Sequence, residues 1–356
     1  MKKPTMKDVA KAAGVSQSTV SFVINDAPIS ISDEVKQRVL QTIDDLGFVP
    51  RAKAKNYSSL SDSIIALFIP NASNFFYMEL IKGINIFTKA NGYRLIVINT
   101  NRDVSNEQYY LSLLQKTKVA GIIYGFTPTI KNVEMLRTLN IPLIVIGEVS
   151  DELDVDVISL NSFLSGEMIA NHLVSRGHKH VSFITSPTNK ISLSRKRRLN
   201  GIEHALSDHA ELKVFSEISE HEHDSSNYEL ELGYNIMKRM LENGNMRSTA
   251  LIGANDMISF GIIKALGEAK IKVPEQVSVC GFDNILFSEL ITPSLTTVDH
   301  CTHWRCSLAV EILDNKIKNK YLAPAKINYD PILIVRNSTG KAPTANSSLQ
   351  QSTHVK

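Results

Sequence analysis

Short apolar runs alternate with amphipathic stretches through most of this chain, from residue 62 to residue 340. The apolar runs are rich in Val, Ile and Leu and have the length of buried parallel strands: Ile64–Ile69, Arg94–Ile98, Gly121–Tyr124, Leu143–Ile146, Val157–Leu160, Val181–Ile184, Ala250–Gly253 and Val277–Cys280. Stretches with helical periodicity lie between them: Phe76–Ala90, Asn106–Thr117, Ser162–Arg176, Arg195–Leu206, Glu229–Leu241 and Met257–Glu268. Repeated strand–helix units predict an α/β fold with open parallel sheets and helices on both faces.

The number of strands, together with a polar stretch at 147–156, predicts two sheets rather than one. A chain of 356 residues has room for about two or three folding units. Open α/β sheets bind ligands beyond the carboxyl ends of their strands. Two sheets that face each other would therefore enclose a ligand cleft.

The charge of the chain is concentrated near its N-terminus. Residues 1–60 hold nine basic and six acidic side chains, which accounts for the whole net charge of +3. The remaining 30 basic and 30 acidic residues cancel. A basic module on a neutral body is typical of nucleic-acid-binding proteins, because cations that neutralise phosphates supply most of the non-specific affinity.

Residues 5–24 have the pattern of two short helices. Thr5-Met6-Lys7-Asp8 has capping-box form, with Asp in place of Glu or Gln, and opens the helical run Met6–Ala13. Gly14 follows as a left-handed cap residue, and Ser16 caps a second helix, Gln17–Ile24. Two helices joined by a short turn with glycine predict a helix-turn-helix. The alternative is a plain helical hairpin, but the second helix carries short hydrogen-bonding side chains, namely Gln17, Ser18, Thr19 and Ser21.

A third helix and a basic segment follow. Ser32 caps the predicted helix, and its apolar stripe is Val35, Val39, Leu40, Ile43 and Leu46, with Gly47 at its end. Lys36 and Arg38 are available for phosphate contacts. The segment 51–59 is basic and poor in core residues. It is either a flexible linker or a hinge that becomes helical on DNA and inserts a side chain into the minor groove.

The first fifty residues closely resemble the headpiece of the lactose, galactose and purine repressor (LacI/GalR) family of bacterial transcription regulators. The resemblance rests on Met6–Ser21, on Asn25 and on Gly47-Phe48-Val49-Pro50. It implies that Gln17 and Ser18 read base edges, while Ser16, Thr19, Ser21 and Asn25 contact the DNA backbone. The full set that it implies for DNA binding is Thr5, Met6, Ser16, Gln17, Ser18, Thr19, Ser21, Phe22, Asn25, Arg51, Ala54 and Tyr57.

Three positions depart from the family pattern. Phe22 stands where the family commonly has an arginine that makes a bidentate contact to guanine. Phenylalanine contacts only apolar groups such as the thymine methyl, so we expect a different operator half-site. Tyr57 replaces the leucine that the family inserts into the minor groove, and its hydroxyl would need a partner there. Arg51 replaces an asparagine and would strengthen attraction to the minor groove.

The resemblance continues nearly to the end of the chain and implies a core like that of a periplasmic sugar-binding protein. It rests on matches spread over that core: His172-Leu173, Gly177–Val181, Arg198–Gly201, Asn255-Asp256, Val277–Asp283, Pro293–Val298 and Arg336–Thr339. It implies three passages of the chain between two lobes, near 160, 293 and 322. The residues that it implies for effector binding are Phe75, Phe76, Arg198, Tyr228, Asn255 and Asp283.

This set suits a sugar, since an arginine donates to hydroxyl groups and a carboxylate accepts from them. Simpler interpretations exist for three of its members. Arg198 belongs to the basic run 195–198, typical of a solvated helix face, Asp283 could cap a turn, and Tyr228 could lie on the surface. Gly147 stands where many relatives have an aspartate, with Glu148 beside it.

Other classes of protein are not indicated. No apolar run is long enough for a signal peptide or a membrane span, and Cys280, Cys301 and Cys306 do not make a disulfide framework. We therefore expect a cytoplasmic protein without a membrane partner. Potential metal ligands in His300–Cys306 and His221-Glu222-His223 match no standard zinc spacing, so we expect no metal and no cofactor. No GxSxG, P-loop or GxGxxG motif has the right flanks, and we expect no enzymatic activity.

The sequence thus predicts a small all-α helix-turn-helix headpiece (1–50), a hinge (51–61), an α/β core of two parallel-sheet lobes (62–340) and a disordered tail (341–356). The predicted function is repression of transcription by a homodimer on near-palindromic double-stranded operator DNA. A small-molecule effector, a sugar or a sugar derivative, would change the affinity for DNA. The alternative is a solute-binding receptor with no role on DNA.

Overall fold

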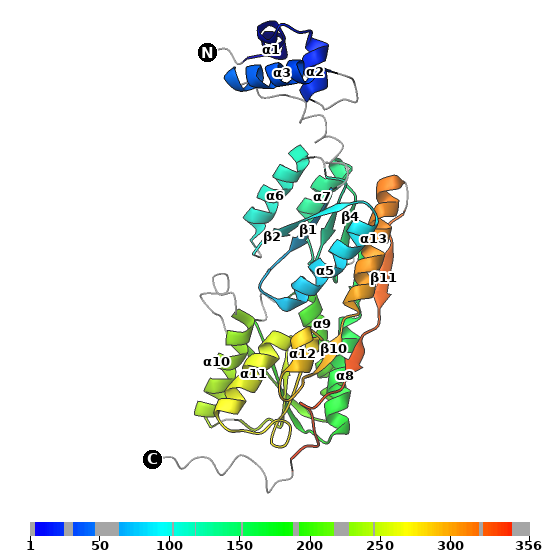
Figure 1. The fold of residues 1–356 in the computed structure, drawn as a ribbon. Helices are drawn as coiled ribbons and strands as arrows, with labels where there is room; N and C mark the ends of the chain where they lie inside the picture. The colour runs from blue at the N-terminus through cyan, green and yellow to red at the C-terminus, as the bar shows by residue number, and fades with distance from the viewer. Residues whose placement is uncertain are drawn as a thin grey trace. The chain divides into compact units, whose positions relative to one another are not determined.

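The computed structural model describes residues 4–24, 31–46, 64–101, 103–117, 119–150, 152–187, 192–216, 228–244, 246–319 and 323–343 (Figure 1). The chain divides into two compact units, Met1–Ser63 and Ile64–Lys356. The expected hinge at 51–61, the tail beyond 343 and the motif His221-Glu222-His223 lie outside the described residues.

The described residues of the first unit form helices α1 (Met6–Ala13), α2 (Gln17–Ile24) and α3 (Asp33–Asp45). Gly14 ends α1 at φ +66°, a left-handed conformation that favours glycine. The Asp8 carboxylate accepts from the Thr5 amide at 2.8 Å, and the Ser16 hydroxyl accepts from the Thr19 amide at 3.1 Å. The predicted caps of α1 and α2 are therefore present and fix the starts of these two helices. Ser32 stands at the start of α3 as predicted, but its side chain makes no capping hydrogen bond. The small core of the unit is Val9, Ala10, Ala13, Val20, Val23 and Val39.

The third helix buries less than its sequence predicts. Val39 is buried, but Leu40 and Leu46 are 48% and 39% exposed, so the expected apolar stripe was wrong at these two positions. Arg38 donates from Nε to the Ala13 carbonyl at 3.2 Å and so ties α3 to the end of α1. The core of the headpiece is small because three short helices enclose few side chains.

The second unit consists of two lobes, each built on a six-stranded sheet. Lobe 1 has the strand order β11-β5-β4-β3-β1-β2, with all pairs parallel. Its elements are β1 (Ile64–Ile69), α5 (Phe75–Ala90), β2 (Arg94–Asn99), α6 (Val104–Thr117), β3 (Gly121–Tyr124), α7 (Ile130–Thr138), β4 (Leu143–Ile146), β5 (Asp156–Leu160), α13 (Thr302–Lys318) and β11 (Lys326–Tyr329).

Helices cover both faces of the lobe 1 sheet, because successive strand residues point to opposite sides. Ile65 and Leu67 of β1 pack in one core with α5 and α13, whereas Ala66 and Phe68 pack in another with α6 and α7. The central strands therefore read as continuous apolar runs rather than as alternating ones. The predicted three-layer arrangement is confirmed (Figure 1).

Lobe 2 has the strand order β12-β10-β9-β8-β6-β7, in which β12 alone runs antiparallel to its neighbour. Its elements are α8 (Ser162–Ser175), β6 (His180–Thr185), α9 (Leu193–Leu206), β7 (Glu211–Ser216), α10 (Tyr228–Glu242), β8 (Ala250–Gly253), α11 (Asp256–Glu268), β9 (Ser278–Asp283), α12 (Leu286–Leu290), β10 (Thr296–Asp299) and β12 (Ile332–Ile334).

The chain passes between the lobes three times. The passages lie between β5 and α8, between β10 and α13, and between β11 and β12. The second and third passages thus fall near 300 and 330, later than the expected positions near 293 and 322, and residue 322 itself lies outside the described residues. The expected positions were too early in the sequence because β10 and β11, which precede these two passages, were not predicted as strands. Residues beside the first two passages, Ser162 and His300, line the cavity between the lobes.

Four of the described strands were not predicted from the sequence, and one strand that was predicted as buried is partly exposed. Strands β7, β10, β11 and β12 are short or partly polar, so they lack a clear apolar signal. Strand β2 was predicted as buried, but it lies at the edge of its sheet, where Ile96 and Val97 are 41% and 39% exposed. An edge strand has a neighbour on one side only, and this explains the exposure.

Glycines set the closest approach between α8 and α9. A Cβ at Gly201 would lie 2.0 Å from the Phe163 carbonyl oxygen, and one at Gly166 would lie 2.1 Å from the Arg198 carbonyl oxygen. Backbone atoms cannot move away as a flexible side chain can. The position of α9, and of the arginines that it carries, therefore depends on these two glycines.

We expect Gly201→Ala to lower the free energy of unfolding by about 1–3 kcal/mol, because the added methyl overpacks the helix contact. Gly267→Ala is the control: its Cβ would meet nothing within 4 Å on α11, so the variant should be neutral or stabilised by about 0.5–1 kcal/mol. Urea unfolding followed by circular dichroism measures both. Equal stability of the two variants would contradict the proposed contact.

Candidate functional site

A cavity of about 110 Å³ lies between the two lobes, at the carboxyl ends of their strands. The residues that line it come from both lobes and from the passages between them: Asn74, Phe76, Phe126, Glu148 and Ser162, then Arg195, Arg198, Asn255, Asp283, His300 and Arg305, among others. Its volume is below the ~300–1,000 Å³ of drug-sized sites. The cavity therefore suits a small polar molecule.

A larger hollow of about 300 Å³ lies at the amino ends of β4 and β5 in lobe 1. Its charged groups are already paired, since Lys316 binds Asp156 at 3.0 Å and Arg137 contacts Asp154. The inter-lobe cavity is different, because buried polar atoms on its wall lack partners. We therefore take the inter-lobe cavity as the candidate site.

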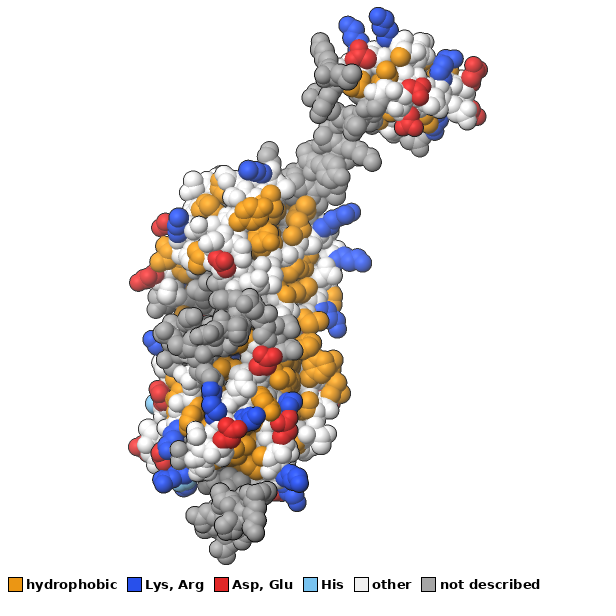
Figure 2. All heavy atoms as spheres, turned by 90° about the vertical axis from the view of Figure 1, so that its left-hand side faces the viewer, with side chains coloured by type: hydrophobic (Ala, Val, Ile, Leu, Met, Phe, Trp, Pro, Cys, Tyr) orange, Lys and Arg blue, Asp and Glu red, His pale blue; other side chains and the backbone are white. Residues whose placement is uncertain are grey.

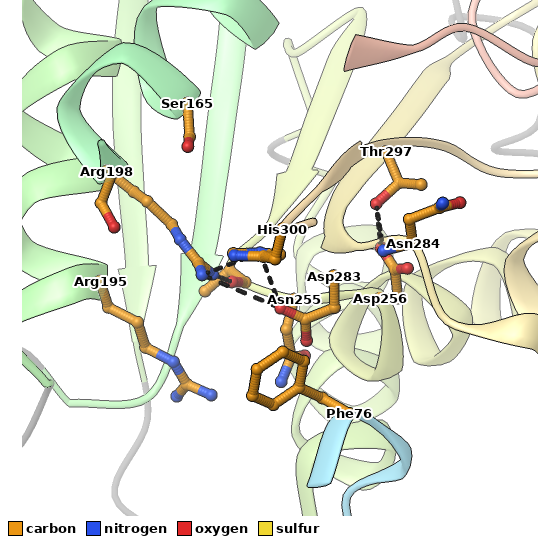
Figure 3. A network of polar contacts seen from close by, with 12 residues as sticks. Phe76, Ser165, Arg195, Arg198, Asn255, Asp256, Asp283, Asn284, Thr297 and His300 are labelled. Atoms are coloured by element: carbon orange, nitrogen blue, oxygen red, sulfur yellow. Dashed lines mark hydrogen bonds and ion pairs between the residues drawn. The ribbon is translucent and has the colours of Figure 1, made fainter. Parts of the chain in front are cut away.

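Arg198, Asp283 and His300 form the polar centre of the cavity wall (Figure 3). Arg198 on α9 donates to the Ala254 carbonyl at 2.9 Å and to His300 Nε2 at 3.1 Å, and it lies 3.8 Å from the Asp283 carboxylate. Its guanidinium also lies over the Phe282 ring, 4.7 Å from the centroid. Burial lowers the pKa of Arg198, and Asp283 opposes that shift. The arginine is thus held in one orientation from several sides.

His300 is buried at the second passage, with its Nε2 atom 3.1 Å from Asp283. Burial lowers the pKa of His300 to about 4, and the positive charge of Arg198 adds to the effect, while Asp283 opposes it. The ring is therefore neutral at pH 7. It stacks edge-on against Phe76 of α5, with centroids 5.7 Å apart, so it joins the polar centre to the apolar wall.

Asp256, at the start of α11, supports this centre from behind. Its carboxylate accepts from the hydroxyls of Thr297 and Ser288, both at 2.6 Å, and from the Ile285 amide at 3.2 Å. Burial raises the pKa of Asp256, and the neighbouring Asp283 adds to the rise. These bonds connect α11 to β10 and α12, and so they fix the segment that carries Asp283.

Ion pairs and ring contacts connect the two lobes around the cavity. Arg197 of lobe 2 binds Glu148 of lobe 1. Glu229 of lobe 2 accepts from Asn74 of lobe 1 and also pairs with Arg195 of its own lobe. The Leu286 amide donates to Glu79, and burial raises the pKa of that carboxyl group. The lobes are thus held together by charged groups at the rim of the cavity.

The structure brings four of the six expected effector residues to the cavity wall: Phe76, Arg198, Asn255 and Asp283. Phe75 is not among the lining residues and packs edge-on against Phe287, with centroids 4.7 Å apart. Tyr228 is 7% exposed and belongs to the lobe 2 core, so it lies neither on the surface nor on the cavity wall. The run 195–198 is not a solvated face throughout, since Arg195 and Arg198 turn inward.

Most lining residues were not predicted as binding residues, and the basic side chains among them are Arg195, His300 and Arg305. The sequence does contain a signal for Arg195. It stands three positions before Arg198, and this spacing places both arginines on one face of the helix. His300 and Arg305 lie in the His300–Cys306 segment, whose sequence pattern points to potential metal ligands and not to an effector site. Within the described residues, no group of His, Cys, Asp and Glu is arranged to hold a metal ion.

In the headpiece, α2 presents the polar face that the sequence predicts. Gln17 and Ser18 are exposed, and Phe22 is 37% exposed. The hydroxyls of Ser16, Ser18 and Thr19 bond to one another, with Ser16 at 2.7 and 2.8 Å from its two partners. Thr5 is exposed, and Met6 packs partly against the headpiece core. Asn25, Arg51, Ala54 and Tyr57 lie outside the described residues.

In the part of the chain that is described, no helix is both long and apolar enough to cross a membrane. The headpiece instead carries the features of a nucleic-acid interface, a short capped helix with exposed polar side chains.

Comparison with known proteins gives two family matches. Residues 5–51 match "Bacterial regulatory proteins, lacI family", and residues 170–339 match "Periplasmic binding protein-like domain". The ribose operon repressor of Escherichia coli K12 is 30% identical over 336 residues, which is 94% of this chain and 99% of the relative.

Two solved structures share the fold. A LacI family transcriptional regulator from Enterococcus faecalis V583 with bound ribose is 25% identical, with a TM-score of 0.67 over 78% of this chain and 99% of that one. The lac repressor dimer bound to operator and an anti-inducer is 22% identical, with a TM-score of 0.69 over 95% of this chain and 100% of that one.

The buried His300 predicts a pH-dependent stability. The unfolded ring has a pKa of about 6.5, so between about pH 6.5 and pH 4 the unfolded chain binds a proton that the folded chain does not. Stability should fall as the pH is lowered through this range, by about 3 kcal/mol from this group. We expect His300→Gln to lose that part of the pH dependence.

Urea unfolding at a series of pH values measures the effect. His209→Gln, at an exposed histidine of lobe 2, is the control and should keep the pH dependence of the wild type. A His300→Gln variant with the same pH dependence as the wild type would show that His300 titrates normally in the folded protein.

Proposed function

The chain belongs to the lacI family of bacterial regulatory proteins, and from this membership and the two candidate sites we propose that it is a repressor whose affinity for operator DNA is changed by a small sugar-like effector. The observation that carries the proposal is the combination in one chain of a capped helix-turn-helix and an enclosed polar cavity between two lobes. The helix-turn-helix alone, or the cavity alone, would also fit other functions.

Operator recognition is assigned to the exposed face of α2. The hydrogen bonds of Ser16 to Ser18 and Thr19 hold the start of the helix, and Gln17 beside them is exposed. Glutamine makes a bidentate contact to adenine in the major groove. Phe22 offers apolar contact to a thymine methyl on the same helix. An A·T-containing half-site is therefore favoured over the guanine contact of the usual family pattern.

The effector is assigned to the inter-lobe cavity. Arg198, Asn255 and Asp283 supply donors and acceptors at close quarters, and Phe76 supplies an apolar wall. This mixture suits a sugar, which presents hydroxyl edges and an apolar ring face. The relative named as ribose operon repressor and the ribose-bound structure support a monosaccharide rather than a larger molecule. Coupling between such a site and DNA affinity is typically worth about 1–3 kcal/mol.

A homodimer is proposed from exposed apolar side chains that lie on connected elements. Met78 and Ile86 on α5 are 52% and 48% exposed, and Leu286 and Leu290 on α12 are 63% and 65% exposed. Phe75 of α5 packs on Phe287 of α12, so the two helices form one surface. Figure 2 shows hydrophobic side chains gathered along one edge of the lobes. A surface of this kind is typical of a protein–protein interface.

The first test is selection of binding sites from a random duplex library, with full-length protein and with residues 64–356. We expect the full chain to enrich a near-palindrome and the truncated chain to enrich nothing, because all assigned base contacts lie in the headpiece. If neither protein enriches a sequence at low salt, the solute-receptor alternative replaces the repressor.

Single substitutions in the headpiece should separate base contacts from phosphate contacts. We expect Gln17→Ala to weaken operator binding by about 1–3 kcal/mol and to relax specificity at one position of the half-site. Lys11→Ala, at an exposed lysine of α1, should weaken binding to all sequences alike and reduce the salt dependence. Fluorescence anisotropy with operator and scrambled duplexes distinguishes the two. A uniform loss in Gln17→Ala would remove this residue from base recognition.

The proposed dimer surface should depend on its apolar side chains. Ile86→Lys combined with Leu290→Lys should convert the protein to a monomer in sedimentation experiments, because the interface would have to bury two unpaired charges in each subunit. Ile130→Lys on α7 is the control, since Ile130 is 47% exposed on a different helix. A double variant that stays dimeric would place the interface elsewhere.

A further inference from the structure

The inter-lobe cavity holds a buried arginine that no carboxylate balances. Arg305, on the first turn of α13, is 3% exposed and lines the cavity. Within the described residues it makes no ion pair, and its nearest polar contacts are the backbone carbonyls of Ile158 at 3.2 Å and His300 at 3.5 Å. Burial lowers its pKa to about 10, so the side chain remains charged at pH 7. An unpaired buried charge is unfavourable unless something offsets it.

The other cations around the cavity each have a carboxylate partner. In the described part of the chain, Arg197 pairs with Glu148, Arg195 with Glu229, and Arg198 with Asp283. Burial raises the pKa of Asp256, which lies behind the wall, to about 8, so this carboxyl group is mostly neutral at pH 7. His300 is neutral at pH 7, because burial lowers its pKa to about 4. The cavity wall therefore carries one unit of positive charge in excess, and that unit belongs to Arg305.

The unpartnered polar atoms on the wall point to the same ligand chemistry. Three buried side-chain nitrogens of lining residues have no hydrogen-bond partner among the described residues: Nε of Arg198, Nδ2 of Asn255 and Nε of Arg305. Each of these atoms is an N–H donor. The amide of Asn255 cannot turn around to exchange its donor for its acceptor, because its oxygen already accepts from the Ile258 amide at 2.9 Å and caps α11. A ligand that forms hydrogen bonds with these three N–H donors must supply acceptor atoms.

Helix ends reinforce the preference for negative charge. The capped N-termini of α5, α9 and α11 begin at Asn74, Ser192 and Asn255, and all three capping residues line the cavity. Helix N-termini carry a partial positive charge. They add to the charge of Arg305 rather than oppose it.

We infer that the effector is an acidic monosaccharide, with a single carboxylate that accepts hydrogen bonds from Arg305 and Asn255 while Arg198 and Asp283 bind its hydroxyl groups. This inference rests on the proposed function, since it specifies the effector of the same cavity. A carboxylate matches the one unpaired cation, whereas a phosphate monoester carries about −1.5 to −2 charges at pH 7 and is larger. Arg305 is thus the residue that selects the charge of the effector.

The test compares neutral sugars with their acids on the full-length protein. The panel is D-glucose and D-galactose, their acids D-glucuronate, D-galacturonate and D-gluconate, and D-glucose 6-phosphate. Isothermal titration calorimetry should give at least one acid a Kd about tenfold or more below that of its parent sugar, because a charge-assisted bond to a buried arginine exceeds a neutral one. A parent sugar that binds as tightly as every acid, or a phosphate that binds best, would overturn the inference.

Arg305→Met tests the residue itself, and Arg137→Met is the matched control on the surface of lobe 1, where the Arg137 side chain is 51% exposed. We expect Arg305→Met to lose the preference for the acid, so that the acid and its parent sugar bind with similar affinity, and Arg137→Met to keep the preference of the wild type. Without ligand, Arg305→Met should be at least as stable as the wild type, because methionine removes an unpaired buried charge. An unchanged affinity for the acid in Arg305→Met would overturn the role of Arg305.

Operator binding, measured separately, keeps the two proposals apart. If the protein binds its operator but no sugar acid binds to it, the inference about the effector fails and the DNA-binding proposal stands. If the protein binds a sugar acid but enriches no operator, the repressor proposal fails and the assignment of the cavity stands. If Arg305→Met does not fold, the comparison of acids with parent sugars on the wild type still decides.

Discussion

Charge buried between the two lobes is the constraint on which the site depends. Arg195, Arg198 and Arg305 are withdrawn from water, and each must find compensation or remain unfavourable. Two of them find a carboxylate, and these pairs also fix the side chains around the cavity. Ion pairs hold the side chains of the cavity wall in fixed positions. The one unpaired charge, on Arg305, makes the cavity favour a negatively charged ligand.

The sheet topology explains why these charges meet. Lobe 1 is entirely parallel and lobe 2 nearly so, and the described helices of both lobes each follow a strand in the sequence. Loops and helix starts from both lobes therefore border one space. The first two passages of the chain add residues that belong to neither sheet: His300 lies in the second passage, and Arg305 lies on the first turn of the helix that follows it. Close helix packing at Gly166 and Gly201 then holds α9 where its arginines reach that space.

Most of the central fold could be predicted from the sequence, because buried strands and amphipathic helices leave strong periodic signals. The strands from Ile64–Ile69 to Val181–Ile184 lie within a residue or two of their predicted bounds. Edge strands could not be predicted in the same way. Strand β7 is largely exposed, and β11 alternates exposed and half-buried residues, so neither shows the apolar run of a central strand. The second and third passages between the lobes were expected too early in the sequence for the same reason, because the strands that precede them give no clear apolar signal.

The sequence by itself determined the family, the caps of the first two headpiece helices and the identity of four cavity residues, since these depend on local spacing or on motif residues. Only the tertiary structure decided which charges are buried and which are paired. Arg195 and Arg305 look like ordinary surface arginines in the sequence, and Tyr228 looks like a ligand contact although it belongs to a core. The physical reason is that burial and pairing depend on groups more than a hundred residues apart in some cases, such as Asn74 with Glu229 and Arg198 with His300, and no local pattern records that proximity.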